Sequence, residues 1–385
     1  MTAPLRLAIA YDCLFPLTTG GGERQYRAMS EELVKRGHQV DYLTALQWDR
    51  EPETPFTLSP VTGRLRLYDD AGVRSSLAAA RFAAGLLGSL VRRRGRYDAV
   101  IVSGLPILNV FAARLALLGS GTQVVVDYLE VWGRAQWVEY AGRPTGTLAW
   151  LLQRAAIRIT PLATCHSRLS ANRLRQEGLR STPLVSPGLI DQVDDVPLRA
   201  DPADPPYVLY VGRHIPDKRV EDLPAAVAQA RHAVPGLELV LLGSGPTTRA
   251  VRAAVEALGS PRWITMPGFV SQERLDELMA GAACLANPSR REGYGLVVVE
   301  AAAHGTPVVV VDHPGNASVE LIDPGVNGFV AESGAPTAFG DAIAAAVRGG
   351  RELRVATRGW FDDAVTTRTI ERTVGAIVEA IQARR

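Results

Sequence analysis

Lysine is almost absent from this sequence of 385 residues. Only Lys35 and Lys218 occur among its 42 basic residues, and the others are arginine, a bias typical of a high-GC genome. Lys35 stands at the end of a predicted helix, where a cation complements the helix dipole and needs no other role. Lys218 is the more informative lysine, because a compact ammonium can reach a phosphate where a planar guanidinium does not fit.

Cysteine and long apolar runs are also scarce. Cys13, Cys165 and Cys284 are far apart, odd in number and without the spacing of metal ligands, so we expect buried thiols in a reducing compartment. The first apolar run, Leu5–Ala10, is too short for a secretion signal. The longest run, Phe82–Val91, is too short to span a bilayer. Together these shortages predict a cytoplasmic protein.

No charge of either sign dominates the sequence. The formal net charge is +2, and no basic patch is rich in aromatic residues, so we expect no nucleic-acid partner. Hydrophobic residues make up 47% and charged residues 21%, a composition typical of a soluble globular enzyme. The length is large for one core and suits two domains.

Short apolar runs alternate with helical patterns along most of the chain. The strands expected in the first half are Leu5–Ala10, Gln39–Thr44, Ala99–Val102, Val124–Asp127 and Leu162–Cys165. Those expected in the second half are Tyr207–Val211, Leu237–Leu242, Trp263–Met266, Cys284–Ala286 and Val308–Val311. This alternation predicts an α/β fold with two doubly wound parallel sheets, each covered by helices on both faces.

Other segments are assigned by their local patterns. Helices are expected at Glu23–Arg36, Ser75–Arg92, Ile107–Leu118, Gly146–Ile159 and Arg168–Glu177. Thr57–Tyr68 is predicted as a hairpin about Thr62-Gly63. The segment Pro187–Pro206, rich in proline and aspartate, is predicted as the interdomain linker. The tail from Thr367 has apolar residues at helical spacing and predicts a helix with one buried face.

The run from Glu292 to Glu300 is the most informative stretch. Gly293 and Gly295 allow a turn to come close to a ligand, and Leu296–His304 predicts a helix whose free N–H groups form an anion site. The two glutamates can accept hydrogen bonds from sugar hydroxyls, so phosphate and hydroxyls together indicate a sugar nucleotide. For each glutamate the alternative is an ordinary helix-start carboxylate or a solvated helix residue.

Further informative residues follow the ends of predicted strands, where ligands of parallel sheets bind. Gly212-Arg213 follows the first strand of the second array, Gly243 follows the next, and Glu292 follows the fourth. Arg213 and Lys218 then have a diphosphate as their natural partner. Surface charge is the alternative interpretation for both.

These motifs resemble those of the retaining nucleotide-sugar glycosyltransferases of family 4, which have the GT-B fold. The segments that carry the resemblance are Gly20-Gly21-Gly22-Glu23-Arg24, Gly212-Arg213 with Lys218, Gly243-Ser244-Gly245-Pro246, Gly268-Phe269-Val270, Asn287-Pro288-Ser289, Glu292-x7-Glu300 and Asn327-Gly328-Phe329-Val330. The resemblance spans most of the chain. It is strong from Tyr207 to Val330 and weak from Asp49 to Tyr97.

The resemblance implies two Rossmann-like domains facing across a cleft. Residues 1–190, with a crossing helix at 365–385, would bind an acceptor, and residues 191–364 would bind a nucleoside-diphosphate sugar, UDP by default. It implies hexose transfer to an acceptor hydroxyl without a cofactor or a metal. The implied catalytic residues are Glu292, Arg213 and Lys218. The implied donor-binding residues are Gly20, Gly21, Gly22, Arg213, Lys218, Gly243, Val270, Glu292, Gly293, Tyr294, Gly295, Leu296 and Glu300.

One departure concerns the acceptor side. Many relatives carry a histidine near the end of the strand that corresponds to Val124–Asp127, and this stretch has none. Asp127, Glu130 and His166 are the candidates to replace it, although His166 taken alone is better explained as an ordinary packed or surface histidine. A candidate aromatic platform for a sugar or cyclitol face, with ordinary packing as its alternative, consists of Tyr128, Trp132, Trp137 and Tyr140.

Other classes remain open. A nicotinamide dehydrogenase fits the Gly20/Gly22 spacing, but its fingerprint needs a glycine at the position of Gln25. An epimerase or a phosphorylase can share the GT-B fold, and a non-catalytic binder would keep the same phosphate site. The segment Ser75–Arg94 fits either a core helix or an amphipathic helix on an anionic membrane. Its few large side chains favour the core, so we expect a soluble acceptor, with a lipid acceptor at the membrane surface as the alternative.

Overall fold

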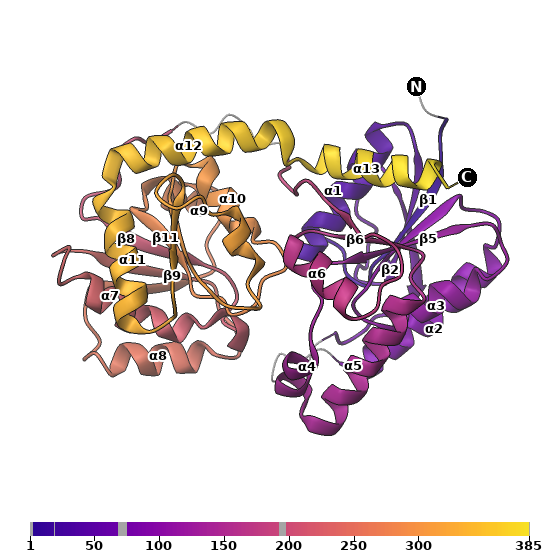
Figure 1. Cartoon of the computed structure of the whole chain (residues 1–385), viewed down its shortest axis with the longest axis horizontal. Coiled ribbons are helices and arrows are strands. Elements are labelled where there is room, and N and C mark those ends of the chain that lie inside the picture. Colours follow the sequence, from indigo (N-terminus) through magenta and orange to yellow (C-terminus); the bar gives the residue numbers. More distant parts are fainter. Residues whose placement is uncertain (1–2, 19, 68–74, 192–197, 385) are drawn as a thin grey trace. The chain divides into compact units, whose positions relative to one another are not determined.

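The computed structural model describes residues 3–18, 20–67, 75–191 and 198–384, and the chain forms two compact units (Figure 1). Among the described residues, unit 1 contains 3–18, 20–67, 75–191 and 368–384, and unit 2 contains 198–367. The sequence placed the domain boundaries at 190 and 365. Part of the predicted linker, residues 192–197, lies outside the described residues.

The sheet of unit 1 has seven parallel strands in the order β3-β2-β1-β4-β5-β6-β7. The strands are β1 (Arg6–Ala10), β2 (Gln39–Ala45), β3 (Thr57–Thr62), β4 (Ala99–Ser103), β5 (Gln123–Tyr128), β6 (Leu162–Cys165) and β7 (Leu184–Val185). β1 pairs with β2 on one side and with β4 on the other, so the strand order reverses at β1. The five strands predicted in this half are confirmed.

The predicted hairpin at Thr57–Tyr68 is wrong over its described part. Thr57–Thr62 is a single strand that pairs in parallel with β2, from Asp41 opposite Thr57 to Ala45 opposite Thr62. The chain leaves the sheet after Thr62, and residues 63–67 form no strand. β3 is therefore part of the main sheet and not one arm of a hairpin. Tyr68 lies outside the described residues.

Helices cover the sheet of unit 1 on both faces. They are α1 (Gly21–Lys35), α2 (Ser76–Arg92), α3 (Leu108–Ala116), α4 (Arg134–Ala141), α5 (Arg143–Arg158), α6 (Arg168–Gln176) and α13 (Ile370–Gln382). Phe82 of α2, Val110 of α3 and Ile157 of α5 share one apolar core with alternate residues of the strands. The C-terminal helix α13 packs against α1, as the neighbouring yellow and indigo ribbons show in Figure 1. The predicted tail helix is thus confirmed.

The sheet of unit 2 has six parallel strands in the order β10-β9-β8-β11-β12-β13. The strands are β8 (Tyr207–Val211), β9 (Glu238–Leu242), β10 (Ile264–Gly268), β11 (Cys284–Asn287), β12 (Val308–Val311) and β13 (Gly328–Ala331). The α-helices are α7 (Leu223–Ala230), α8 (Thr248–Glu256), α9 (Gln272–Gly281), α10 (Leu296–Ala303), α11 (Pro336–Arg348) and α12 (Gly350–Thr367). Short 3₁₀ turns span Pro216–Lys218, Val220–Asp222 and Ala317–Leu321.

The strand order of unit 2 reverses between β8 and β11. From β8 the chain adds β9 and β10 on one side, and it then returns to place β11 on the other side. In open α/β sheets, ligands bind outside the carboxyl ends of the strands at such a reversal. The segments that follow β8 and β11 are therefore the first place to look for a ligand site in this unit.

Candidate active site

Lys218 and Glu292 meet at the strand-order reversal of unit 2. Lys218 ends the 3₁₀ turn that follows β8, and Glu292 lies in the loop between β11 and α10. The Lys218 Nζ atom forms an ion pair and hydrogen bond with Glu292 Oε1. Their side chains are 24% and 14% exposed, so the pair is open enough to meet a ligand.

The carboxylate of Glu292 is held by further donors. The Ser289 hydroxyl donates to Glu292 Oε1 at 3.2 Å, and the Asn287 side-chain amide approaches the same oxygen at 3.4 Å. The Glu292 backbone N–H donates to the Gly315 carbonyl at 3.1 Å, and the Ala317 N–H donates to the Glu292 carbonyl at 3.0 Å. Glu292 is thus fixed on both its side chain and its backbone.

A second contact ties the β8 turn to the β11 loop. Arg291 donates from its guanidinium to Asp217 Oδ1 at 2.7 Å, and the Arg290 N–H donates to the Asp217 carbonyl at 2.8 Å. The Arg291 side chain is 6% exposed, which makes this a largely desolvated pair. Because Asp217 precedes Lys218 directly, the contact fixes the position of the lysine relative to Glu292.

Gly295 forms the sharp turn that starts α10. Its φ angle is +107°, and a Cβ atom at this position would lie 2.7 Å from Ser318 Cβ. Both the backbone angle and the space therefore require glycine. α10 begins at the next residue, Leu296, so its first N–H groups and its positive dipole end open towards this turn.

The remaining predicted residues of this motif lie around the turn. Tyr294 is 9% exposed, whereas Gly293, Leu296 and Glu300 are half-buried, and Glu300 lies in the second turn of α10. The structure therefore brings the whole segment from Glu292 to Glu300 to the carboxyl end of β11. The predicted helix at Leu296–His304 is confirmed, with its last residue, His304, as the C-cap.

The glycine loops after β8 and β9 pack directly on each other. A Cβ atom at Gly243 would lie 2.1 Å from the Gly212 carbonyl oxygen, and one at Gly245 would lie 2.3 Å from the His214 carbonyl oxygen. The His214 N–H donates to the Ser244 carbonyl at 3.0 Å. Side chains larger than hydrogen would separate these loops, so the glycines keep them together beside the β8 turn.

Arg213 and Val270 complete the predicted residues of unit 2. Arg213 is exposed and directly follows Gly212, while the Tyr210 hydroxyl donates to the Arg213 carbonyl at 3.1 Å. Burial and the nearby Glu292 raise the pKa of Tyr210, and the Arg213 guanidinium opposes that shift. Val270 is half-buried two residues after β10, whose last residue, Gly268, accepts the Gly243 N–H at 2.8 Å.

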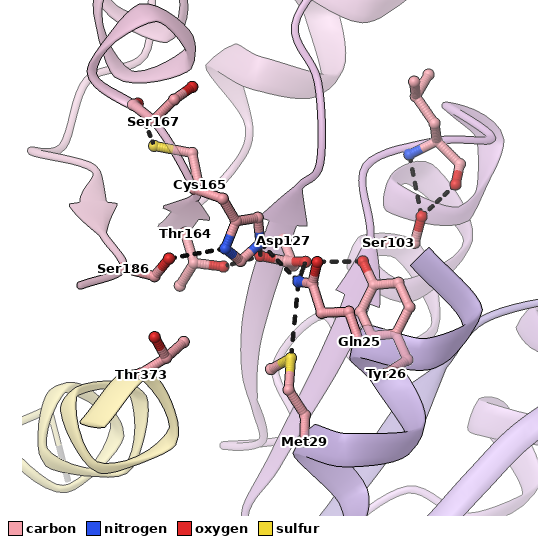
Figure 2. Close-up of polar contacts among 12 residues, drawn as sticks. Gln25, Tyr26, Met29, Ser103, Asp127, Thr164, Cys165, Ser167, Ser186 and Thr373 are labelled. Carbon is pink, nitrogen blue, oxygen red and sulfur yellow. Dashed lines mark hydrogen bonds and ion pairs between the residues drawn. The ribbon is translucent and has the colours of Figure 1, made fainter. Parts of the chain in front are cut away.

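Unit 1 carries its own polar centre around Asp127, at the end of β5 (Figure 2). Asp127 is fully buried. Its carboxylate accepts hydrogen bonds from Tyr26 Oη at 2.9 Å, Thr164 Oγ1 at 2.6 Å and Gln25 Nε2 at 3.2 Å, and His166 Nε2 lies 2.9 Å from its Oδ1.

The Asp127 centre joins several elements of unit 1. Gln25 and Tyr26 come from α1, Thr164 from β6, and His166 from the loop after β6. His166 Nδ1 also lies 2.8 Å from the hydroxyl of Ser186. Burial alone raises the pKa of Asp127, but attraction to His166 and the hydrogen bonds of His166, Thr164 and Tyr26 outweigh it, so the net pKa is lowered. The carboxylate is therefore charged and fully enclosed by its donors.

The structure separates the three acceptor-side candidates. The side chains of Asp127 and His166 are 0% and 1% exposed, so both are enclosed by other side chains of the protein. Glu130 is half-buried, and its Oε2 accepts the Trp132 indole N–H at 2.7 Å. Glu130 is thus the accessible member of the set, whereas Asp127 and His166 are buried.

Of the four residues of the predicted aromatic platform, three contact one another through their rings. Trp132 lies 4.7 Å from Trp137 and 5.1 Å from Tyr140 between ring centroids, and all three pack on the core of unit 1. Tyr128 is buried in β5, where its hydroxyl lies 2.9 Å from Thr160 Oγ1. It belongs to the same core as the other three, as a buried residue of the strand.

The glycines at the start of α1 are close to other segments of unit 1. A Cβ atom at Gly20 would lie 2.3 Å from Glu23 Oε2, so the Glu23 carboxylate folds back over the first turn. A Cβ atom at Gly22 would lie 2.9 Å from both Tyr11 Oη and Leu129 Cδ1. The Gly20-Gly21-Gly22 turn therefore lies beside the residues that follow β1 and β5, at the carboxyl edge of this sheet.

Sequence reasoning missed most of the residues that hold these centres. Asp217, Arg291 and Ser289 position the Lys218–Glu292 pair, and only Ser289 stood in a quoted motif. Gln25, Tyr26, Thr164 and Ser186 surround Asp127 and His166, but up to 141 residues separate Gln25 from His166. Strand-end placement was the one available signal, since Thr164 and His166 flank the end of β6.

Within the described residues, no group of three or more histidines, cysteines or carboxylates is arranged to hold a metal ion. No helix in that part of the chain has the length and apolar character needed to cross a membrane.

Comparison with known proteins identifies the family. The family described as "Glycosyl transferases group 1" matches residues 198–358, and the "Glycosyl transferase 4-like domain" matches residues 20–188. The two matches together account for most of the chain, which belongs to the family 4 glycosyl transferases with the GT-B fold.

Curated relatives match mainly in part. D-inositol 3-phosphate glycosyltransferase of Segniliparus rotundus is 34% identical over 165 residues, which is 42% of this chain and 36% of the relative. Glycogen synthase of Mycobacterium tuberculosis is 26% identical over 352 residues, covering 86% of this chain and 83% of the relative. The first relatives are thus matched over only about a third of their length.

Solved structures share the fold over nearly the whole chain. Sucrose-phosphate synthase from Thermosynechococcus elongatus superposes with a TM-score of 0.78 at 20% identity, covering 99% of this chain and all of that one. HepE from Anabaena in complex with UDP and glucose gives a TM-score of 0.70 at 17% identity, covering 98% of this chain.

Proposed function

We propose that the protein is a retaining glycosyltransferase that moves a hexose from a nucleoside diphosphate, UDP by default, to an acceptor hydroxyl. The observation that carries the proposal is the Lys218–Glu292 pair at the strand-order reversal of unit 2, beside the start of α10. A cation, a carboxylate and a helix N-terminus at one strand end are the groups that a sugar diphosphate needs.

Each predicted donor residue has a role in this proposal. Arg213, Lys218 and the first N–H groups of α10 neutralise the diphosphate, and the turn at Gly243 and Gly295 allows the backbone to approach it. Glu300 accepts hydrogen bonds from the ribose diol. Glu292 faces the transferred sugar, where a carboxylate stabilises the positive charge that develops on that sugar in the transition state.

The reaction proceeds by attack on the face from which the diphosphate departs. The acceptor oxygen forms a bond to the anomeric carbon as the bond from that carbon to the diphosphate oxygen breaks. The acceptor proton passes to the departing oxygen, so no separate general base is required. Arg213 and Lys218 supply the charge stabilisation that a divalent cation provides in other transferases, and we propose that no cofactor or metal is needed.

The acceptor site is assigned to unit 1. Because Asp127 and His166 are enclosed, we propose that they fix the position of α1 and β5 and that Glu130 is the nearer candidate for contact with the acceptor. A small soluble sugar, a cyclitol or a natural product is the first candidate acceptor, with the reaction in the cytoplasm. An acceptor in a membrane is the second, because unit 1 has a basic and apolar face, described below.

A ligand screen followed by an activity assay tests the proposal. Thermal unfolding is measured with UDP-, GDP-, ADP- and dTDP-sugars, since a ligand at about a hundred times its Kd stabilises by about 2.7 kcal/mol. The preferred donor is then incubated alone, with a panel of hydroxyl acceptors, and with a chelator. Sugar transfer that survives the chelator is expected.

The same experiment separates the alternatives. An epimerase would convert the donor without any acceptor, and a phosphorylase would need inorganic phosphate. A binder would be stabilised by a donor yet transfer nothing to any acceptor. Stabilisation by none of the four donors would reject the donor site itself.

A further inference from the structure

Four helices of unit 1 contain no acidic residue. Within their described bounds, α2, α3, α5 and α6 carry arginines but neither aspartate nor glutamate. The arginines of the first three are Arg81, Arg92, Arg114, Arg143, Arg154 and Arg158. The whole chain has 40 acidic residues for 42 basic ones, so this one-sided composition is a local property of one side of unit 1.

The same helices expose large apolar side chains. Leu115 and Leu118, at the end of α3, are 65% and 66% exposed, and Leu148 and Leu151 of α5 are 58% and 51% exposed. Leu148, Leu151 and Ile159 are spaced by three and eight residues, which places them on one side of a helix. They form a stripe about 16 Å long that follows the axis of α5.

The ends of these helices adjoin each other. Phe111, Arg114, Leu115, Leu118 and Ile159 line one shallow hollow between the ends of α3 and α5. The Arg94 guanidinium, just beyond α2, donates to the Leu118 carbonyl, so the arginine-rich end of α2 borders the same hollow. We call the surface made by Leu115, Leu118, Leu148, Leu151 and Ile159 with Arg114 the α3–α5 face.

We propose that the α3–α5 face docks unit 1 on an anionic lipid bilayer. Leucine side chains enter the boundary between head groups and acyl chains, while arginines reach the lipid phosphates. Because the leucine stripe follows the axis of α5, that helix lies flat on the membrane surface. This inference concerns where the protein binds, and it holds whether or not the proposed transfer reaction is correct.

The face favours lipid over the other possible occupants. A second copy would present an identical face across a two-fold axis and bring its arginines against those of the first copy, with no carboxylate from these helices to compensate. Nucleic acid would bind the arginines but leave the exposed leucines without a partner. An anionic bilayer satisfies both features at once.

The structure places the apolar anchors on other helices than α2. The sequence favoured the core interpretation of Ser75–Arg94, and Phe82, Leu86 and Leu90 of α2 are fully buried in the core of unit 1. α2 is therefore a core helix that contributes its arginine-rich end. The apolar anchors are on α3 and α5, which the sequence alone did not single out.

Vesicle flotation with the full chain tests the proposal. We expect binding to vesicles of phosphatidylcholine mixed with phosphatidylglycerol, weak binding to phosphatidylcholine alone, and release at high salt. The triple variant Leu115→Asp, Leu118→Asp, Leu151→Asp should lose binding. The charge reversals Arg143→Glu and Arg158→Glu should each weaken it by at least about fivefold, the equivalent of about 1 kcal/mol per basic residue.

Matched controls lie on unit 2. Val355→Asp and Arg252→Glu change exposed residues of α12 and α8 and should leave vesicle binding unchanged. All variants should retain the wild-type melting temperature and stabilisation by UDP, which separates loss of docking from loss of folding or of the donor site. Equal loss of binding in the unit 2 controls would overturn the assignment of the face.

Two other outcomes would also overturn it. One is wild-type protein that does not float with anionic vesicles at low salt. The other is a dimer in analytical ultracentrifugation that the triple aspartate variant converts to a monomer, since the face would then be occupied by a second copy.

Discussion

Lys218, one of only two lysines in this arginine-rich chain, is held in place by charged neighbours. Lys218 contacts Glu292, and Asp217 beside it is fixed by Arg291. The ammonium can exchange its carboxylate partner for phosphate oxygens without a change of backbone, because the 3₁₀ turn that carries it is fixed. A guanidinium at this position would be longer and planar, and it would meet the same carboxylate with a different geometry.

Replacement of Lys218 should therefore weaken donor binding strongly. We expect Lys218→Ala to weaken binding of a nucleoside-diphosphate sugar by about 2–4 kcal/mol, since a charged hydrogen bond to a partly buried phosphate is lost. Lys218→Arg should not restore it. Titration calorimetry with the donor found in the screen measures both.

The second lysine provides the matched control. Lys35 is at the end of α1, where its side chain is 60% exposed, and Lys35→Ala should leave donor affinity unchanged. Wild-type affinity in Lys218→Ala would remove this lysine from the donor site.

Variants of Glu300 and Glu292 should affect the binding of UDP differently. Glu300→Ala should weaken both UDP and the whole donor, since its proposed partner is the ribose. Glu292→Gln should leave UDP affinity near the wild-type value and lower kcat, because the neutral amide no longer stabilises positive charge on the sugar. Calorimetry with UDP and initial rates with the donor test this division. An equal loss of UDP affinity in both variants would contradict it.

At the scale of elements, the start of α10 depends on one glycine. Gly295→Ala should destabilise unit 2 by more than the cost of a positive φ angle alone, about 1–2 kcal/mol, because the new Cβ would lie 2.7 Å from Ser318 Cβ. The shifted helix start should also weaken UDP binding. Urea denaturation and calorimetry measure the two effects.

Gly236→Ala isolates the contribution of the backbone angle. Gly236 has a φ of +86° and no atom within 4 Å of an added Cβ, so the alanine meets strain but no contact. Its cost should be smaller than that of Gly295→Ala, with UDP affinity unchanged. Equal losses of unfolding free energy in the two variants would show that Ser318 moves away from the new Cβ without cost.

The Asp127 centre joins α1, β5 and β6 and should matter first for stability. We expect Asp127→Asn to reduce the free energy of unfolding by about 1–3 kcal/mol, since buried donors lose their charged acceptor. Activity should fall only modestly, and no covalent sugar adduct should form. Mass spectrometry after incubation with donor tests the last point, and an adduct in the wild-type protein would replace same-face attack with double displacement.

The pH dependence of this loss has a defined sign. The pKa of Asp127 is lowered on folding, so its stabilisation is fully present above the unfolded pKa of about 3.9 and is lost as the pH falls through the folded pKa. The difference between wild type and Asp127→Asn should therefore shrink in acid. Asp49→Asn, at a side chain that is 98% exposed, should show almost no difference at any pH.

Local patterns predicted the strands well but not every element. All ten predicted strands form, because short apolar runs between glycine-rich turns determine a buried strand locally. β7 has only two residues and β13 begins at Gly328, so neither gives a strong run. α4 was missed, and the supposed hairpin at Thr57–Tyr68 failed because pairing with β2 depends on residues far away in sequence.

The same distinction applies to the sites. Residues after β8, β9 and β11 were predicted to converge because the carboxyl ends of parallel strands share an edge, and Lys218 and Glu292 do meet. The enclosure of Asp127 was not predictable, since its partners come from α1, from β6 and from the loop after β6, far from β5 or from one another in the sequence. The exposure of the leucines on the α3–α5 face was also not predictable, because it depends on which side of α5 packs on the sheet.

At the scale of the whole molecule, family membership fixes the fold, and the reaction depends on the residues of the site. Solved structures at 20% and 17% identity share the fold, and such a fold hosts several reactions. The features particular to this chain are the Lys218–Glu292 pair in unit 2 and the enclosed carboxylate in unit 1. The proposed mechanism uses the first and does not rely on direct attack by the second.

The stereochemistry of the product tests that conclusion for the intact enzyme. Retention by double displacement needs a carboxylate nucleophile beneath the anomeric carbon, and Asp127 is fully buried among its donors. We therefore expect same-face attack with charge stabilisation by Arg213, Lys218 and the α10 N–H groups, so that an α-linked donor gives an α-linked product. Glu130→Gln should lower the rate modestly without changing the anomer. Proton couplings at the anomeric carbon of the purified product identify the linkage, and a β-linked product from an α-linked donor would refute the retaining mechanism.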